Sequence, residues 1–172
     1  KNKIYMKLLK GIKDKEFPKD ESTLKNREAS RAVLFDENKL IPLLFVSKFN
    51  YHKLPGGGID PGEDKSKALI REVREEVGSE IKVTGEIGKI IEFRSKWNLK
   101  QVSYCYLGEI ISKGNPNFTE KELGEGFKVV WLSLKEAISR VKNDKPENYD
   151  GKFIQKRDLC FLKKAKQMVG ID

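Results

Sequence analysis

The pattern of apolar and polar positions along the chain predicts an α/β fold. Two apolar runs, RAVLFD and LIPLLFVS, flank the turn-forming segment DENK and predict a β-hairpin whose second strand is largely buried. Pro42 lies in the second run and is typical of the start or the edge of a strand. Three further strands are expected, at residues 82–93, 100–111 and 128–132.

Apolar residues at helical spacing predict three helices. The first spans about residues 65–77, has Asp64 as its N-cap, and presents a stripe of core residues, Leu69, Val73 and Val77. Ser133 and Glu136 have the spacing of a capping box that opens a second helix, which runs to about Val141. The third helix closes the domain and carries the apolar residues Ile154, Phe161, Leu162, Ala165 and Val169. Loops are expected at residues 113–126 and over NDKPENYDG.

The N-terminal segment alternates charged residues with turn formers. It predicts a strand and loop extension (residues 1–26) ahead of a single domain (residues 27–172). A length of 172 residues with 38% hydrophobic content suits one domain with a real core. No apolar run is long enough to cross a bilayer, and the N-terminus lacks the features of a secretory signal. We therefore expect a cytoplasmic protein with no membrane partner.

The net charge of +9 favours anionic partners such as nucleotides, nucleic acids or phosphorylated metabolites. The lysines are scattered, as on a solvated surface, and this pattern does not favour nucleic acid as a specific partner. Cys105 and Cys160 have no further Cys or His at metal-ligand spacing, and His52 is the only histidine. We therefore expect two reduced cysteines and no histidine-based metal site. A homodimer is compatible with the sequence.

Acidic residues are concentrated between Asp60 and Glu80. This segment has seven acidic against four basic residues, a local charge of −3 in a chain of +9. On a helix, Glu72, Glu75 and Glu76 share one face about one turn long, where like charges repel each other. A hard divalent cation with oxygen ligands, magnesium in particular, would neutralise them. The alternative is an ordinary exposed helix of glutamates and arginines.

Glycines next to this helix favour the metal site over that alternative. Gly56, Gly57 and Gly58 let the backbone approach a metal or a phosphate closely, and Gly62 permits a sharp turn. The segment resembles the box of the Nudix hydrolases, G-x5-E-x7-R-E-U-x-E-E-x-G-U, in which U is a bulky apolar residue. The matching residues are Gly57, Glu63, Arg71, Glu72, Val73, Glu75, Glu76 and Gly78. Ser79 replaces the last apolar residue of the pattern.

The resemblance implies a Nudix-type α/β/α sandwich around a mixed β-sheet, with the box as a loop, a helix and a loop. It also implies hydrolysis of a nucleoside diphosphate linked to another moiety, with Mg²⁺ as cofactor and Mn²⁺ as a substitute. The implied metal ligands are the side chains of Glu72, Glu75 and Glu76 and the backbone carbonyl of Gly57. The implied catalytic residues are Arg71, which orients a glutamate, with Glu72, Glu75, Glu76 and a late-loop base. Glu63 is implied to be a supporting residue.

The sequence leaves open which residue is the late-loop base and which molecule is the substrate. Glu122 and Glu125 are both candidates for the base, and we prefer Glu125 because it is nearer to the following strand. We expect a small substrate, namely a nucleoside triphosphate, an oxidised nucleotide or a nucleotide sugar. The alternatives are a non-catalytic nucleotide-binding regulator and an RNA 5′-end pyrophosphohydrolase. Candidate base-stacking residues are Phe93, Trp97, Tyr104 and Tyr106, and candidate phosphate contacts are Lys53, Arg94 and Lys96.

Overall fold

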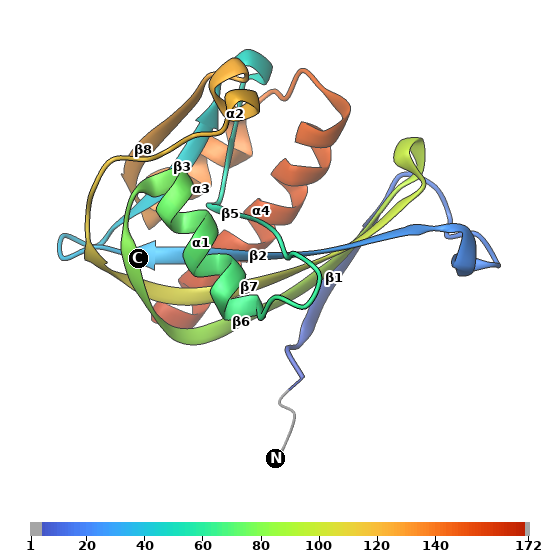
Figure 1. Cartoon of the computed structure of the whole chain (residues 1–172), viewed down its shortest axis with the longest axis horizontal. Helices are drawn as coiled ribbons and strands as arrows, with labels where there is room; N and C mark the ends of the chain where they lie inside the picture. The colour runs from blue at the N-terminus through green and yellow to red at the C-terminus, as the bar shows by residue number, and fades with distance from the viewer. Residues whose placement is uncertain (1–4, 171–172) are drawn as a thin grey trace.

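The computed structural model describes residues 5–170, which form two β-sheets and four α-helices (Figure 1). A five-stranded mixed sheet has the order β1-β6-β7-β2-β5, and a three-stranded sheet has the order β4-β3-β8. The strands of the larger sheet are β1 (Leu8–Lys13), β2 (Lys25–Phe35), β5 (Gly56–Gly58), β6 (Glu80–Arg94) and β7 (Leu99–Ser112). Those of the smaller sheet are β3 (Leu40–Val46), β4 (Tyr51–Lys53) and β8 (Phe127–Ser133). The helices are α1 (Lys65–Val77), α2 (Glu120–Gly124), α3 (Leu134–Asn143) and α4 (Tyr149–Val169).

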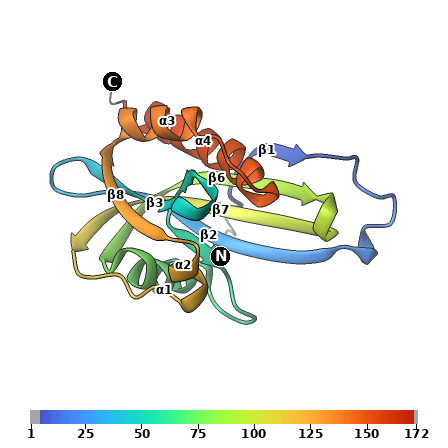
Figure 2. The same ribbon diagram turned by 90° about the horizontal axis from the view of Figure 1, so that it is seen from above.

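Helices cover both faces of the strands. Figure 2 shows α1 and α2 on one side and α3 and α4 on the other, so the predicted α/β/α sandwich is confirmed. On one side, α1 packs its fully buried Leu69 and Val73 against apolar residues of β2 and β3. On the opposite side, α4 buries Phe161, Leu162 and Ala165 in a second apolar cluster. The two clusters hold the helical layers against the strands.

The larger sheet mixes parallel and antiparallel pairs. β2 runs parallel to β7 along its whole length, and β1 runs parallel to β6, whereas β6 and β7 are antiparallel. The strand predicted within residues 1–26 is β1, and it belongs to the main sheet. The division of the chain into an extension and a domain stays a prediction.

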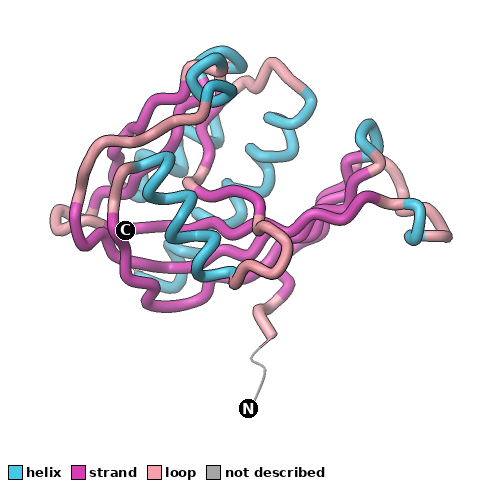
Figure 3. The backbone as a smooth tube through the Cα atoms, viewed as in Figure 1, coloured by secondary structure: helices cyan, strands magenta, loops and turns pink. Residues whose placement is uncertain are grey.

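Four strands extend beyond the helices. In Figure 3 the far ends of β1, β2, β6 and β7 project together as an arm, which we define as the turns at residues 14–24 and 95–98 with the strand ends that lead into them. The Lys25 amide donates to the Asn98 carbonyl at 2.8 Å, and the Ser95 hydroxyl donates to Asp14 at 2.7 Å. These contacts join the two turns of the arm.

The predicted β-hairpin is wrong. A tight turn does connect β2 to β3, with the Asp36 amide donating to the Leu40 carbonyl at 2.9 Å, but the two strands belong to different sheets. β2 pairs with β7, and β3 pairs with β8. Both runs are largely buried, so their side-chain pattern does not determine which strand they pair with. Pro42 is tolerated in β3 because β4 pairs only with residues 44–46, on one side of that strand.

The helix predictions are confirmed for α1 and α3 and incomplete elsewhere. Asp64 caps α1 by accepting from the Ser66 amide at 2.6 Å, and Ser133 caps α3. The predicted loop 113–126 contains α2, whose capping box is formed by Thr119 and Glu122. Helix α4 begins at Tyr149, inside the segment predicted as a loop, because Asn148 caps it. The residues around the starts of α2 and α4 are polar, like those of a loop, and for this reason neither start was predicted.

Candidate active site

A cleft of about 540 Å³ opens beside the N-terminal part of α4, between α1, α2, β5 and the arm. This size suits a small-molecule site. Most residues predicted from the sequence as candidate site residues line it, namely Gly57, Glu72, Glu75, Glu76, Glu122 and Glu125. Arg71 lies just behind the cleft and reaches it through a hydrogen bond to Glu72. The fold therefore brings the candidate residues together.

The carboxylates of α1 are not an exposed face. Glu76 is 1% exposed and Glu72 is 9% exposed, so the alternative of an ordinary solvated helix is wrong. Glu76 accepts from the Gly56 amide at 3.4 Å, and its other oxygen lies 3.8 Å from the ammonium of Lys53. Buried carboxylates with so little compensation are costly in an apolar interior.

The electrostatics of these glutamates favours a cation. Burial raises the pKa of Glu76 to about 8, and the nearby Lys53 ammonium only partly offsets this effect. Burial, with the charges of Glu122 and Glu72, raises the pKa of Glu75 to about 7. Both shifts show that the ionised carboxylates are disfavoured here, chiefly by burial and further by neighbouring negative charge. A bound divalent cation would favour the ionised carboxylates.

Arg71 clamps two carboxylates. Its guanidinium donates two hydrogen bonds of 2.9 Å to Glu63, a third of 2.9 Å to Glu72, and one of 3.0 Å to the Gly58 carbonyl. The hydrogen bonds from Arg71 lower the pKa of Glu63 to about 2. A planar guanidinium with two partners fixes the orientation of each. Glu63 thus holds Arg71, and Arg71 holds Glu72.

Because Gly57 has no side chain, its backbone lies close to the Glu72 carboxylate. A Cβ added at Gly57 would lie 2.6 Å from the Glu72 carboxylate, too near for any side chain. Gly57 pairs with Ser30 of β2, so its position is fixed by the sheet. The backbone therefore lies close to the Glu72 carboxylate, whereas the expected approach of the glycines to a metal or a phosphate stays a prediction.

The residues fit a magnesium ion held together with its substrate. Within residues 5–170, no group of three acidic, histidine or cysteine side chains is close enough to hold an ion alone. Magnesium needs no such group, because it is usually held by one or two carboxylates, waters and substrate phosphates. Glu72 and Glu76 provide buried carboxylate oxygens at the cleft, and Glu75 and Glu122 line it as well.

Glu122 and Glu125 both line the cleft at the end of α2. Oε1 of Glu122 accepts from the Thr119 amide at 2.9 Å, so one oxygen of this carboxylate is engaged in the capping box. Glu125 is the C-cap residue and is half-buried. The preference for Glu125 as the base stays a prediction.

Arginines on the opposite wall were missed by the sequence reasoning. Besides the anticipated Lys53 and Arg94, the cleft is lined by Arg27, Arg31 and Arg157. The sequence contains a signal for two of them. Arg27 and Arg31 are four residues apart in a strand, so their side chains lie on the same face. Of the four aromatic candidates only Trp97 lines the cleft, where it is 45% exposed. The candidate phosphate contact Lys96 is not among the lining residues.

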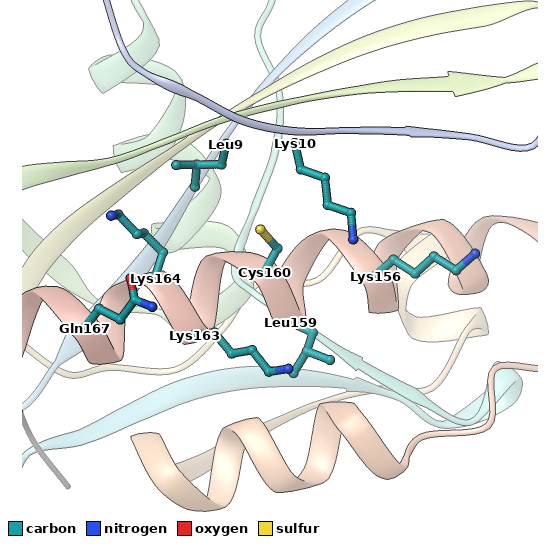
Figure 4. A pocket seen from close by; sticks show the side chains of 8 residues that line it. All are labelled: Leu9, Lys10, Lys156, Leu159, Cys160, Lys163, Lys164 and Gln167. Carbon is teal, nitrogen blue, oxygen red and sulfur yellow. The ribbon is translucent and has the colours of Figure 1, made fainter. Parts of the chain in front are cut away.

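A second pocket of about 410 Å³ lies between β1 and α4 (Figure 4). Four of the eight side chains that line it are lysines, and none is a carboxylate. It therefore has no anionic ligands for a hard cation, and its lysines would repel one. The cleft beside α1 is the better candidate for metal-dependent chemistry.

Comparison with known proteins identifies the family. A family model described as the NUDIX domain matches residues 25–156. The chain belongs to this family. Diphosphoinositol polyphosphate phosphohydrolase 3-beta from Bos taurus is 29% identical over 140 residues, which are 77% of this chain and 79% of the relative. The RNA pyrophosphohydrolase from a Nitratiruptor species is 36% identical over 108 residues, which are 62% of this chain and 60% of the relative.

Solved structures support the same fold. A Nudix hydrolase from Nitrosomonas europaea superposes with a TM-score of 0.61 at 15% identity, covering 84% of this chain and 90% of that one. The predicted class, a Nudix hydrolase, is confirmed. Among the described residues, no helix is long and apolar enough to cross a membrane.

Proposed function

We propose that this Nudix hydrolase cleaves a diphosphate linkage in a reaction that depends on a divalent metal, with Mg²⁺ as the preferred ion and Mn²⁺ as a substitute. The burial of Glu72 and Glu76 at the cleft carries this proposal. A protein that only binds nucleotides as a regulator has no need to bury two carboxylates where a phosphate approaches. The negative charge of these carboxylates is stabilised when a divalent metal binds at the cleft together with the substrate phosphate.

In this mechanism the protein positions the reactants. A divalent metal held by the residues of the cleft would supply positive charge against the negative charge that develops on the attacked and leaving phosphates. Glu72 and Glu76 supply the protein ligands, and Arg71 keeps Glu72 in place through its hydrogen bond. Glu125 orients the attacking water and accepts its proton.

We further propose that the substrate is a small molecule in which a nucleoside diphosphate is linked to another moiety. The exposed ring of Trp97 at the cleft supports this choice because it offers a stacking surface for a base or sugar. The Nitratiruptor relative is named for RNA, and for that reason the 5′ end of RNA is the second candidate. A cytoplasmic location and a homodimer remain predictions.

A substrate screen tests the proposal. The full chain is incubated with nucleoside triphosphates, oxidised nucleotides, dinucleoside polyphosphates, nucleotide sugars and 5′-triphosphorylated RNA, each with Mg²⁺ or with EDTA. We expect phosphate-containing products from a small substrate only when metal is present. Cleavage of the RNA alone would overturn the small-substrate proposal, and no cleavage of any compound would favour a nucleotide-binding regulator.

A further inference from the structure

Arg31 is a buried cation without a carboxylate partner. It lies on β2, is 3% exposed, and lines the cleft. Its Nε donates one long hydrogen bond of 3.4 Å to the hydroxyl of Ser103. Its Nη1 is the one buried side-chain nitrogen or oxygen within residues 5–170 that has no hydrogen-bond partner. Burying a charged donor without a hydrogen-bond acceptor is strongly unfavourable. An acceptor that bound to this atom would therefore be stabilised.

The surrounding carboxylates are already engaged by other arginines. Arg157 pairs with Glu92 at 3.1 Å and with Asp158 at 2.8 Å, and Arg94 pairs with Glu92 at 2.7 Å. Burial and the positive charge of Arg157 lower the pKa of Arg31 to about 9, although Asp158 partly opposes this effect. Asp150 is likewise engaged, by Arg94 at 3.1 Å, so none of these carboxylates is left to pair with Arg31.

Arg27 adds a second cation that lacks a counter-charge. It lies four residues before Arg31 on the same strand and donates to the side-chain oxygen of Gln101 at 2.7 Å. Neither arginine takes part in an ion pair with any residue that the structure describes. Two guanidiniums that line one cleft and have no ion-pair partner are suited to a phosphate.

The glycines of β5 let side chains from both halves of the cleft approach its backbone closely. A Cβ at Gly58 would lie 3.1 Å from Nη2 of Arg27, and a Cβ at Gly57 would meet Glu72. The two arginines and the candidate metal ligands Glu72 and Glu76 line the same cleft. A substrate whose diphosphate lies at the glutamates therefore occupies the cleft that Arg27 and Arg31 also line.

We propose that Arg31 and Arg27 form an anion subsite, which binds a phosphate group that the substrate carries in addition to the diphosphate that is cleaved. The subsite rests on the proposed function, because it is defined relative to the cleaved linkage. It selects phosphate-rich substrates over compounds whose second moiety is uncharged. A purely structural Arg31, needed only for the fold, is the competing explanation.

Metal-free binding of inorganic tripolyphosphate tests the subsite directly. Calorimetry in EDTA compares the full-length wild type with Arg31→Met and Arg27→Gln. Lys163→Gln is the matched control, because it removes the same charge from the second pocket shown in Figure 4. We expect each arginine substitution to raise the Kd about 10- to 100-fold, and the control to change it by less than about twofold. Circular dichroism verifies that each variant is folded.

The outcomes separate the subsite from its alternatives. Unchanged binding by folded Arg31→Met and Arg27→Gln overturns the proposal, as does a loss confined to Lys163→Gln. If Arg31→Met fails to fold, Arg27→Gln decides alone, and wild-type binding by it overturns the proposal. Because this assay contains no metal, the subsite can stand when the hydrolysis screen fails, or fail when the screen succeeds. A lower kcat/KM for ADP-ribose 2′-phosphate than for ADP-ribose in wild type also contradicts it.

Discussion

Replacement of Gly57 by alanine perturbs the site through one methyl group. The added Cβ would lie 2.6 Å from the Glu72 carboxylate, whereas ordinary van der Waals contact begins at 3.4 Å. The carboxylate must therefore shift by about 0.8 Å, away from the position that Arg71 holds. Gly57 does not have a positive φ, so alanine is compatible with its backbone conformation. The perturbation is thus confined to the side chain of Glu72.

A displacement of about 1 Å in a positioned group lowers the rate by about 100-fold. We expect Gly57→Ala to reduce kcat/KM by about 10- to 100-fold and to weaken Mn²⁺ binding, as measured by electron paramagnetic resonance. Overpacking at this position destabilises the fold by about 1–3 kcal/mol. The unfolding transition therefore moves but stays cooperative. The assay uses the best substrate from the screen at saturating Mg²⁺.

Gly85→Ala is the matched control for this prediction. Its added Cβ meets nothing nearer than 3.9 Å, and Gly85 lies outside the cleft on β6. We expect wild-type kinetics and wild-type Mn²⁺ affinity from this variant. Equal losses in both variants, or wild-type activity in a folded Gly57→Ala, would refute the inference that Gly57 makes room for Glu72.

Four other substitutions probe the base, the buried ion pairs and the arginine clamp. Glu125→Gln should lower kcat more than Glu122→Gln, because the capping box occupies Glu122; the reverse order in steady-state assays would reassign the base. Arg157→Met should destabilise the protein by about 3–5 kcal/mol in urea unfolding, since it leaves the buried Asp158 without its ion pair and Glu92 with Arg94 alone, and a smaller loss would contradict that pairing. Hydrogen bonds from Arg71 lower the pKa of Glu63 to about 2. The stability that ionised Glu63 contributes to the fold is therefore complete above its unfolded pKa of about 4.3 and is lost as the pH falls toward 2. The difference in Tm between wild type and Glu63→Gln should shrink over that window, and a constant difference would contradict the linkage.

Local signals made α1 predictable. The cap at Asp64, the apolar stripe of the helix and the left-handed Gly78 that ends it, with φ of 65°, all lie within one short segment. The glycines and glutamates of the site belong to the same segment, so the acidic half of the cleft was also predictable. Interactions between sequence neighbours determine such features.

The strand pairing and the arginine half of the cleft depend on long-range contacts, which could not be predicted from the sequence. β2 pairs with β7, about 74 residues away, and β3 pairs with β8, although the two apolar runs and the turn between them allowed a hairpin. Arg157 reaches Glu92 across 65 residues, so the arginine half of the cleft is assembled by tertiary packing. Strand pairing depends on which partner is available, and a single sequence does not contain that information.

Turnover of Glu76→Gln tests the central claim most directly. The substitution keeps the shape of a side chain that is 1% exposed but removes the charge of a proposed metal ligand. Loss of a group that only supports a metal ligand lowers affinity or activity about 10- to 100-fold. We therefore expect kcat with Mg²⁺ to fall by at least about 100-fold, with weaker Mn²⁺ binding and an intact fold. A folded Glu76→Gln variant that retains wild-type turnover and metal affinity would contradict the account.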